Sequence, residues 1–99
     1  MSQRVVVTGI GLVTPLGTGT ELTWNNLIEG KSGIRRITRF DAESTGMTAT
    51  IAGEVPDFEL ESFLNKKDAR KMDTFIHYGI AAARMALDQS GLEITDANA

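Results

Sequence analysis

The longest periodic stretch of this chain is residues 66–92, which read KKDARKMDTFIHYGIAAARMALDQSGL. Apolar and small residues recur there at steps of three and four, which predicts one face of a long helix. These residues are Met72, Ile76, Gly79, Ile80, Ala83, Ala86 and Leu87. Gly91 suits a left-handed C-terminal cap, and Leu92 can fold back on the last turn. We therefore expect a single helix with an apolar face for burial.

The first turns of this predicted helix are strongly basic, with four of the ten basic residues of the chain. Lys66 and Arg70 are four residues apart, as are Lys67 and Lys71, and like charges at that spacing destabilise a helix by about 0.2–0.5 kcal/mol. The macrodipole also disfavours cations at a helix N-terminus. Two interpretations remain open from the residues alone: a contact surface for an acidic partner, or a solvated face partly neutralised by nearby carboxylates. Those carboxylates are Glu59, Glu61, Asp68 and Asp73.

Length and composition limit the functions that this chain can have. Ninety-nine residues form one small domain or part of a larger one. The chain has no cysteine, which excludes a disulfide framework, a thiolate metal site and a cysteine nucleophile within it. A net charge of -3 argues against general nucleic-acid binding. Because we find neither an 18-residue apolar run nor a signal peptide, we expect a cytoplasmic protein without a membrane span.

Residues 4–12, which read RVVVTGIGL, predict a strand buried on both faces because three consecutive valines are β-branched and apolar. Gly9 and Gly11 at its end resemble the start of a dinucleotide-binding fingerprint. That fingerprint requires a third glycine at position 14 and a helix opening there, whereas the chain has Thr14 followed by Pro15. We therefore expect these glycines to allow close approach of another backbone, not to bind a nucleotide.

A turn and a capped helix are predicted next. Pro15 and Gly17 indicate the turn. Thr18 and Glu21 have the spacing of a capping box, which predicts a helix from this point to Gly30. That helix carries Trp24, Leu27 and Ile28 on one side, and we expect Trp24 to lie in the core.

The remaining elements are shorter. Residues 31–41 are expected to be a connector, residues 48–55 a short strand, and residues 56–64 a helical turn that leads into the long helix. Thr95 and Asp96 form a further cap pattern with no helix after it. The order of elements predicts an α/β architecture. Too few strands are present to cover a valine-rich central strand, so residues 1–99 are expected to be the N-terminal part of one larger domain, with no internal boundary.

Other polar residues give weaker signals. His77 is the only histidine, and without cysteine or a second histidine it cannot anchor a zinc site, so we expect a surface or half-buried helix residue. Asp68 and Asp73 are five residues apart and do not face each other as an acid–base pair. We expect both carboxylates to neutralise part of the positive charge of the neighbouring basic residues. No metal or cofactor site is predicted.

Five segments resemble, in order and spacing, the N-terminal part of the condensing enzymes of bacterial fatty-acid synthesis, the β-ketoacyl-acyl-carrier-protein synthases. The segments are RVVVTGIGLVTPLG, TWNNLIEGKSGI, FD, IAGEVPDF and ARKMDTFIHYGIAAARMALDQSGL. The resemblance covers nearly the whole chain. It implies a thiolase-like fold of layered α/β/α/β/α architecture, incomplete in this chain, and usually a homodimer.

The resemblance also implies an activity. Members of the family perform a decarboxylative Claisen condensation of acyl- and malonyl-loaded acyl carrier protein, using a cysteine and two histidines that lie C-terminal of position 99. None of these catalytic residues is therefore expected in this chain, and His77 matches neither histidine. In similar synthases, basic residues at the start of this helix dock the acidic recognition helix of acyl carrier protein, and the resemblance implies the same role here. The matching positions are Lys67, Arg70 and Lys71, with Lys66 adjacent.

Three hypotheses follow. The first is a segment of an active synthase, inert by itself because nucleophile and base are absent. The second is a non-catalytic subunit of the same fold, similar to a chain-length factor, or a carrier-protein binding module. The third is a small independent domain. The nucleophilic cysteine of the longer protein separates the first two, and a thermal melt of the 99 residues tests the third.

Overall fold

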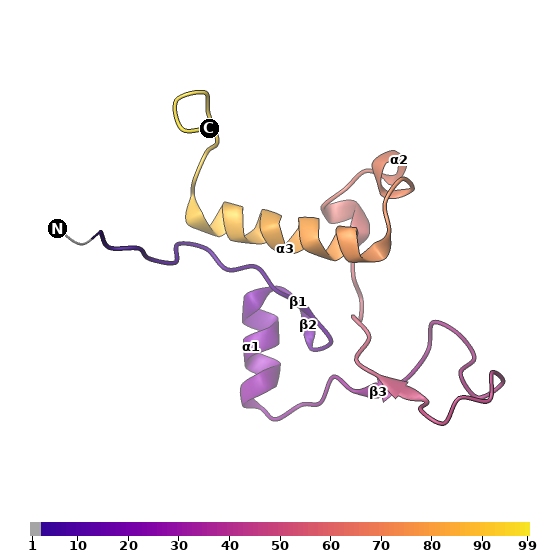
Figure 1. Cartoon of the computed structure of the whole chain (residues 1–99). Helices are drawn as coiled ribbons and strands as arrows, with labels where there is room; N and C mark the ends of the chain where they lie inside the picture. Colours follow the sequence, from indigo (N-terminus) through magenta and orange to yellow (C-terminus); the bar gives the residue numbers. More distant parts are fainter. Residues whose placement is uncertain (1–2) are drawn as a thin grey trace. The chain divides into compact units, whose positions relative to one another are not determined.

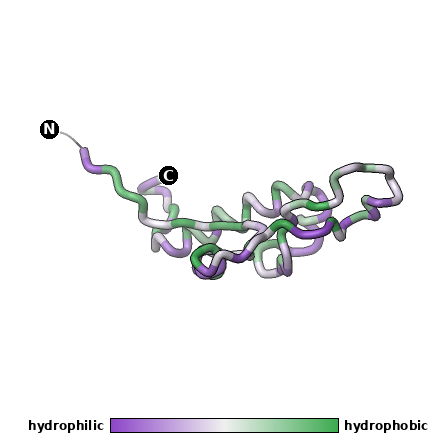
Figure 2. The backbone as a smooth tube through the Cα atoms, turned by 90° about the horizontal axis from the view of Figure 1, so that it is seen from below, coloured by the Kyte–Doolittle hydropathy of each residue, from purple (hydrophilic) through white to green (hydrophobic). Residues whose placement is uncertain are grey.

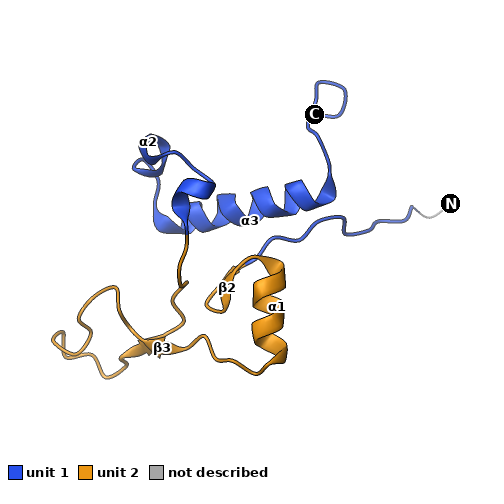
Figure 3. Ribbon diagram, turned by 180° about the vertical axis from the view of Figure 1, so that it is seen from behind, with its two compact units in different colours: residues 1–12, 59–99 blue, residues 13–58 orange. Residues whose placement is uncertain are grey.

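A computed structural model describes residues 3–99. Their contacts divide the chain into two units, the first made of residues 1–12 and 59–99 and the second of residues 13–58 (Figure 3). The first unit therefore combines both ends of the chain. That residues 1–99 belong to one domain of a larger fold stays a prediction.

The first unit is organised on helix α3, Thr74–Ser90, which ends at Gly91 (Figure 1). Gly91 has φ 70°, so the predicted left-handed cap is confirmed. The prediction of one helix over residues 66–92 is wrong, because a separate short helix α2, Lys66–Ala69, precedes α3. Asp73 explains the break: its backbone is extended, and its carboxylate accepts a hydrogen bond from the Thr74 N–H at 2.7 Å. An N-cap at this position starts a new helix instead of continuing the first.

The N-terminal segment of this unit runs beside α3. Cβ atoms placed on Gly9 and Gly11 would overlap the carbonyl oxygens of Ala86 and Ala82. Two extended residues advance about 6.6 Å and four helical residues about 6 Å, so the two glycines match one turn of the helix face. The Ile10 N–H donates to Gln89 Oε1 at 2.6 Å. The prediction that these glycines allow close backbone approach is confirmed.

The predicted strand over residues 4–12 is not formed. Val5, Val6 and Val7 are instead exposed, Val5 to 92%. A strand needs a neighbour that supplies its ladder hydrogen bonds. No strand among residues 3–99 pairs with this segment. The hydrophobic character of the segment is visible in Figure 2.

The second unit begins with a hairpin and a helix. Strand β1, Val13–Thr14, pairs antiparallel with β2, Gly17–Thr18, around the predicted turn. Helix α1, Thr20–Ile28, follows. The capping-box prediction is wrong, because Gly19 is the N-cap and makes no side-chain cap hydrogen bond. Thr18 belongs to β2, and its buried hydroxyl has no hydrogen-bond partner among residues 3–99.

Helix α1 is attached to its unit by its polar side. The buried Thr23 hydroxyl lies 3.1 Å from Thr14 Oγ1 and donates to the Gly17 carbonyl at 3.3 Å. Asn26 Nδ2 donates to the Leu16 carbonyl at 2.7 Å. The apolar side is uncovered, and Trp24 is 58% exposed, so the prediction that it lies in the core is wrong for the chain as it stands.

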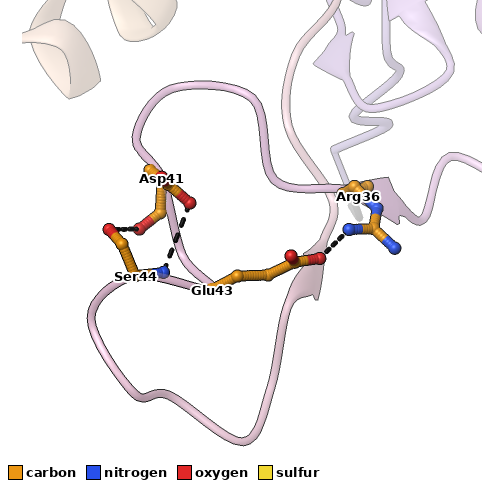
Figure 4. A network of polar contacts seen from close by, with 4 residues as sticks. All are labelled: Arg36, Asp41, Glu43 and Ser44. Carbon is orange, nitrogen blue, oxygen red and sulfur yellow. Dashed lines mark hydrogen bonds and ion pairs between the residues drawn. The ribbon is translucent and has the colours of Figure 1, made fainter.

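A second antiparallel pair joins β3, Arg35–Arg36, to β4, Ile51–Ala52. The strand predicted over residues 48–55 is thus reduced to two residues. The loop between β3 and β4 is held by polar contacts (Figure 4). Arg36 forms an ion pair with Glu43, and the Ser44 N–H donates to an Asp41 carboxylate oxygen at 3.3 Å.

The predicted helical turn over residues 56–64 shortens to a 3₁₀ helix, η1, Leu60–Ser62. Residues 95–99 form a turn without a helix, in which the Thr95 N–H donates to Asn98 Oδ1. Among residues 3–99 the buried side chains are small. They are Thr23, Ala42, Ala69 and Ala81. The described part of the chain therefore combines two strand pairs with several helices and has no core of large apolar side chains.

Candidate functional site

The four predicted docking cations lie on and immediately after α2, not at the start of one long helix. Asn65 caps α2: its Oδ1 accepts from the Asp68 N–H at 2.8 Å, while its Nδ2 donates to Asp68 Oδ2 at 2.9 Å. Asp68 is thus engaged with Asn65, as Asp73 is with the start of α3. Within residues 3–99 neither forms an ion pair with the cations, so any partial neutralisation of the basic cluster by these carboxylates acts through space and not by direct pairing.

The break between α2 and α3 changes the electrostatic argument. Arg70 is the C-cap of α2, and Lys71 follows in a turn closed by its own N–H and the Asp68 carbonyl at 3.1 Å. Cations at a helix C-terminus are favoured by the helix dipole, although a four-residue helix has only a small one. The interpretation that the cations lie at the wrong end of a helix is therefore wrong for Arg70 and Lys71, whereas Lys66 and Lys67 are the first two residues of α2. Their spacing still places several positive charges on one exposed turn.

The four cations differ in their partners. Lys66 forms an ion pair with Glu61 at 3.3 Å, in which both side chains are mostly exposed. Within residues 3–99, Lys67, Arg70 and Lys71 form no ion pair, and all three are exposed. We call these three the free cations. They carry three uncompensated positive charges in a chain whose net charge is -3.

His77 ties α3 to the end of α2. Its Nε2 lies 2.9 Å from the Ala69 carbonyl oxygen, which also accepts from the Met72 N–H at 3.2 Å. A carbonyl only accepts, so Nε2 carries a proton and donates. The side chain is half-buried, which confirms the expected environment. Its position fixes the orientation of the helix that carries the cations.

A groove next to the cations was not predicted from the sequence. It lies between η1 and α2 and has a volume of about 590 Å³. Leu60, Leu64 and Ala69 give it an apolar surface, and Lys66 and Arg70 lie on the same groove. The sequence contains a signal for it, since apolar residues four and five apart flank Asn65, but the pattern places Leu60 and Leu64 in a helical turn and Ala69 in the following helix.

A second polar region lies in the other unit. Glu54 accepts hydrogen bonds from the Thr38 hydroxyl at 2.8 Å and from the N–H groups of Thr38 and Arg39. The Thr38 hydroxyl is the main reason that the pKa of Glu54 lies below its usual range. Arg35 donates to the Pro15 carbonyl at 2.7 Å. These groups satisfy one another and stabilise the loop; they do not form a set of unpaired donors aimed at a ligand.

No catalytic constellation is assembled in the described part of the chain. Residues 3–99 contain no group of three or more His, Cys, Asp or Glu side chains that could hold a metal ion. In the same range, no helix is long and apolar enough to cross a membrane.

Comparison with known proteins identifies relatives along the whole chain. The profile of the beta-ketoacyl synthase N-terminal domain matches residues 2–99. The chain is 55% identical over 97 residues to 3-oxoacyl-(acyl-carrier-protein) synthase 2 of Vibrio harveyi and 50% identical to that of Vibrio cholerae. It is 42% identical to the corresponding synthase of a Synechocystis species. Each match covers 98% of this chain and 23% of the relative, so the chain spans about a quarter of the length of these proteins.

A solved structure is also similar. The ishigamide ketosynthase/chain length factor superposes with a TM-score of 0.77 at 42% sequence identity, over 94% of this chain and 22% of that one. The predicted α/β class and thiolase-like fold are thereby confirmed, with this chain corresponding to a part of that fold. The chain belongs to the beta-ketoacyl synthase family and matches the N-terminal domain of that family.

Proposed function

We propose that the protein containing this chain is a 3-oxoacyl-acyl-carrier-protein synthase of fatty-acid elongation. It condenses an acyl group with malonyl-acyl carrier protein, and loss of CO₂ from the malonyl group supplies the carbon nucleophile. The proposal is supported by the family profile and by relatives of 42–55% identity that carry this name.

In this proposal the chain supplies scaffold and a docking surface, not chemistry. A condensing enzyme of this kind needs a thiolate to hold the acyl group, and the chain has no cysteine. The cysteine and two histidines belong to the remaining three quarters of the enzyme. Residues 1–99 alone are inert, and no cofactor is required.

The free cations are the observation that supports the docking role. Acyl carrier protein presents an acidic recognition helix, and three exposed cations that form no ion pair within residues 3–99 are complementary to it. Charges at the rim of an interface speed encounter and fix orientation more than they add affinity. Such a surface suits a carrier that must bind and leave in each cycle.

Charge reversal at the free cations tests this role in the full-length enzyme. The K67E/R70E/K71E variant should raise the apparent KM for acyl-carrier-protein substrates about tenfold or more, because steering by three charges is lost. The KM for small thioester surrogates should not change. Arg84→Glu is the matched control, since Arg84 is also exposed but lies on α3. Equal losses with both kinds of substrate, or an equal loss in the Arg84 variant, would show that the cluster does not dock the carrier.

The second candidate is a non-catalytic subunit, favoured by one observation: the similar solved structure is named as a ketosynthase/chain length factor. Such a subunit keeps the scaffold without the nucleophile. Labelling of the full-length protein with a chloroacetamide probe distinguishes the two, because only an active synthase has a reactive cysteine at its acyl site.

We further propose a homodimer in the cytoplasm that contacts neither nucleic acid nor membrane. The net charge of -3 supports the first of these exclusions. Light scattering coupled to gel filtration of the full-length enzyme should give twice the subunit mass. A monomer mass at micromolar concentration would contradict the dimer.

A further inference from the structure

The groove between η1 and α2 has two walls of opposite charge and an apolar floor. Ala69 is only 6% exposed, and Leu60 and Leu64 are half-buried, so the floor is formed by aliphatic side chains. Glu59 and Glu61 come from the side of η1. The cationic side is formed by Lys66 and Arg70 of α2 and its cap.

One ion pair joins the two walls. Lys66 Nζ lies 3.3 Å from Glu61 Oε1, and both side chains are more than two-thirds exposed. An exposed pair of this kind is weak and exchanges easily for another partner. Arg70, on the same wall as Lys66, has no ion pair within residues 3–99. An incoming carboxylate therefore meets one free cation and one that can be released.

We propose that this groove receives an aliphatic side chain from the acidic helix of acyl carrier protein. The inference rests on the docking role proposed above and extends it from a charged rim to an apolar anchor beside that rim. The carrier's carboxylates bind the free cations and draw Lys66 away from Glu61, while the apolar side chain covers the floor. Charge complementarity favours this occupant: Lys66 and Arg70 make one wall positive, and Lys67 and Lys71 extend that charge beyond the groove. An acidic helix with an apolar residue on the same face matches both the positive wall and the apolar floor.

The two contributions have different salt dependences. Contacts with the free cations weaken as salt screens them. Burial of an aliphatic side chain does not weaken with salt. The groove therefore supplies the part of the affinity that persists at high ionic strength.

Ser62 offers a way to fill the groove with little effect on the fold. It lines the groove, is exposed, and its hydroxyl has no hydrogen-bond partner within residues 3–99. In the full-length enzyme, Ser62→Trp should raise the Kd for acyl carrier protein about tenfold at both 50 mM and 500 mM salt, as expected when one aliphatic side chain can no longer be buried. Ser62→Ala should bind like the wild type. Lys71→Glu should weaken binding at low salt only.

A second pair of variants tests the release of Lys66. Glu61→Gln removes its partner and should lower the Kd about twofold at low salt. Glu59→Gln removes a carboxylate from the same wall without freeing a cation. It is therefore the control for a gain in affinity caused only by weaker repulsion of the carrier's carboxylates. A larger gain for Glu61→Gln than for Glu59→Gln supports the exchange, and equal gains contradict it.

The outcomes of these experiments separate the docking role of the free cations from the binding of an apolar side chain in the groove. If Lys71→Glu weakens binding and Ser62→Trp leaves the Kd unchanged, the docking role stands and the groove inference is overturned. If neither variant changes the Kd, the docking role itself is wrong. If Ser62→Trp lowers the melting temperature of the enzyme by more than about 5 °C, the groove is filled by another segment of the same protein, which also overturns the inference.

Discussion

Gly11 shows how one atom can control the packing of an element. The backbone of residues 9–11 lies so close to α3 that a Cβ on Gly11 would overlap the Ala82 carbonyl oxygen. The obstacle is helix backbone, which cannot move aside without breaking its own hydrogen bonds. Gly79 lies on the same helix, and a Cβ there would meet nothing within 4 Å.

Gly11→Ala should therefore destabilise the full-length enzyme strongly, by about 3 kcal/mol or more. Gly79→Ala should instead be neutral or stabilise it by up to about 1 kcal/mol, because alanine is favoured over glycine inside a helix. Urea denaturation followed by circular dichroism measures both. A Gly11→Ala variant as stable as Gly79→Ala would show that the segment does not pack on α3 as described.

Glu54 is a second residue with a defined local role, since it holds Thr38 and Arg39 at the start of the loop between β3 and β4. Hydrogen bonds to the charged carboxylate lower its pKa, the Thr38 hydroxyl contributing most, while partial burial opposes them. With a folded pKa below the unfolded one, the stabilisation is present above the unfolded pKa of about 4.3. It is lost as the pH falls through the lowered folded pKa.

Hydrogen exchange can follow this clamp locally. After correction for intrinsic rates, protection of the Thr38 and Arg39 amides should fall as the pH decreases below about 4. The Glu54→Gln variant should show low protection at all pH values. Glu43→Gln, which alters the Arg36 ion pair of the same loop, should keep the wild-type pH dependence. Protection that stays constant to pH 3 in the wild type would contradict the role of Glu54.

At the scale of elements, the sequence predicted segments better than their boundaries. The apolar period runs from Met72 to Leu87 and crosses the start of α3, so periodicity indicates no helix boundary at Asp73. The decisive signal was Asp73, a residue type typical of N-caps, which ends one helix and starts another. At Thr18 a local cap pattern was present, but pairing with another segment overrode it. The spacing to Glu21 was right, but hairpin pairing with Val13 placed Thr18 in a strand.

The candidate site was partly accessible to prediction. Charge and spacing indicated a cluster of four cations on exposed turns, and the family resemblance singled out Lys67, Arg70 and Lys71. The structure shows all three exposed. The structure adds a physical difference between them and Lys66, because Lys66 forms an ion pair with Glu61 that depends on how η1 turns into α2. The groove floor likewise brings Leu60 and Ala69 together through the Asn65 cap. A pattern based on a single continuous helix cannot place them together.

At the scale of the whole molecule, the main feature is apolar surface that no other part of residues 3–99 covers. Seventeen large hydrophobic side chains between residues 5 and 94 are exposed, and within residues 3–99 no large side chain is fully buried. The exposed sides include the valines of the N-terminal segment, Trp24 of α1 and Leu87 of α3. Surfaces of this kind are typical of contacts with further polypeptide. The relatives, of which this chain spans 23%, have that additional length.

We therefore expect the 99 residues produced alone to lack a cooperative fold. Thermal melting followed by circular dichroism should give a broad, shallow transition, because few apolar contacts are lost together. The dye ANS should bind strongly, since it reports exposed apolar surface. The full-length enzyme is the control and should melt sharply with little ANS binding. A sharp transition in a monomeric 99-residue chain would contradict this prediction: it would mean that small buried side chains and polar contacts such as Thr23–Thr14 suffice to hold the fold, and that the segment is an independent domain.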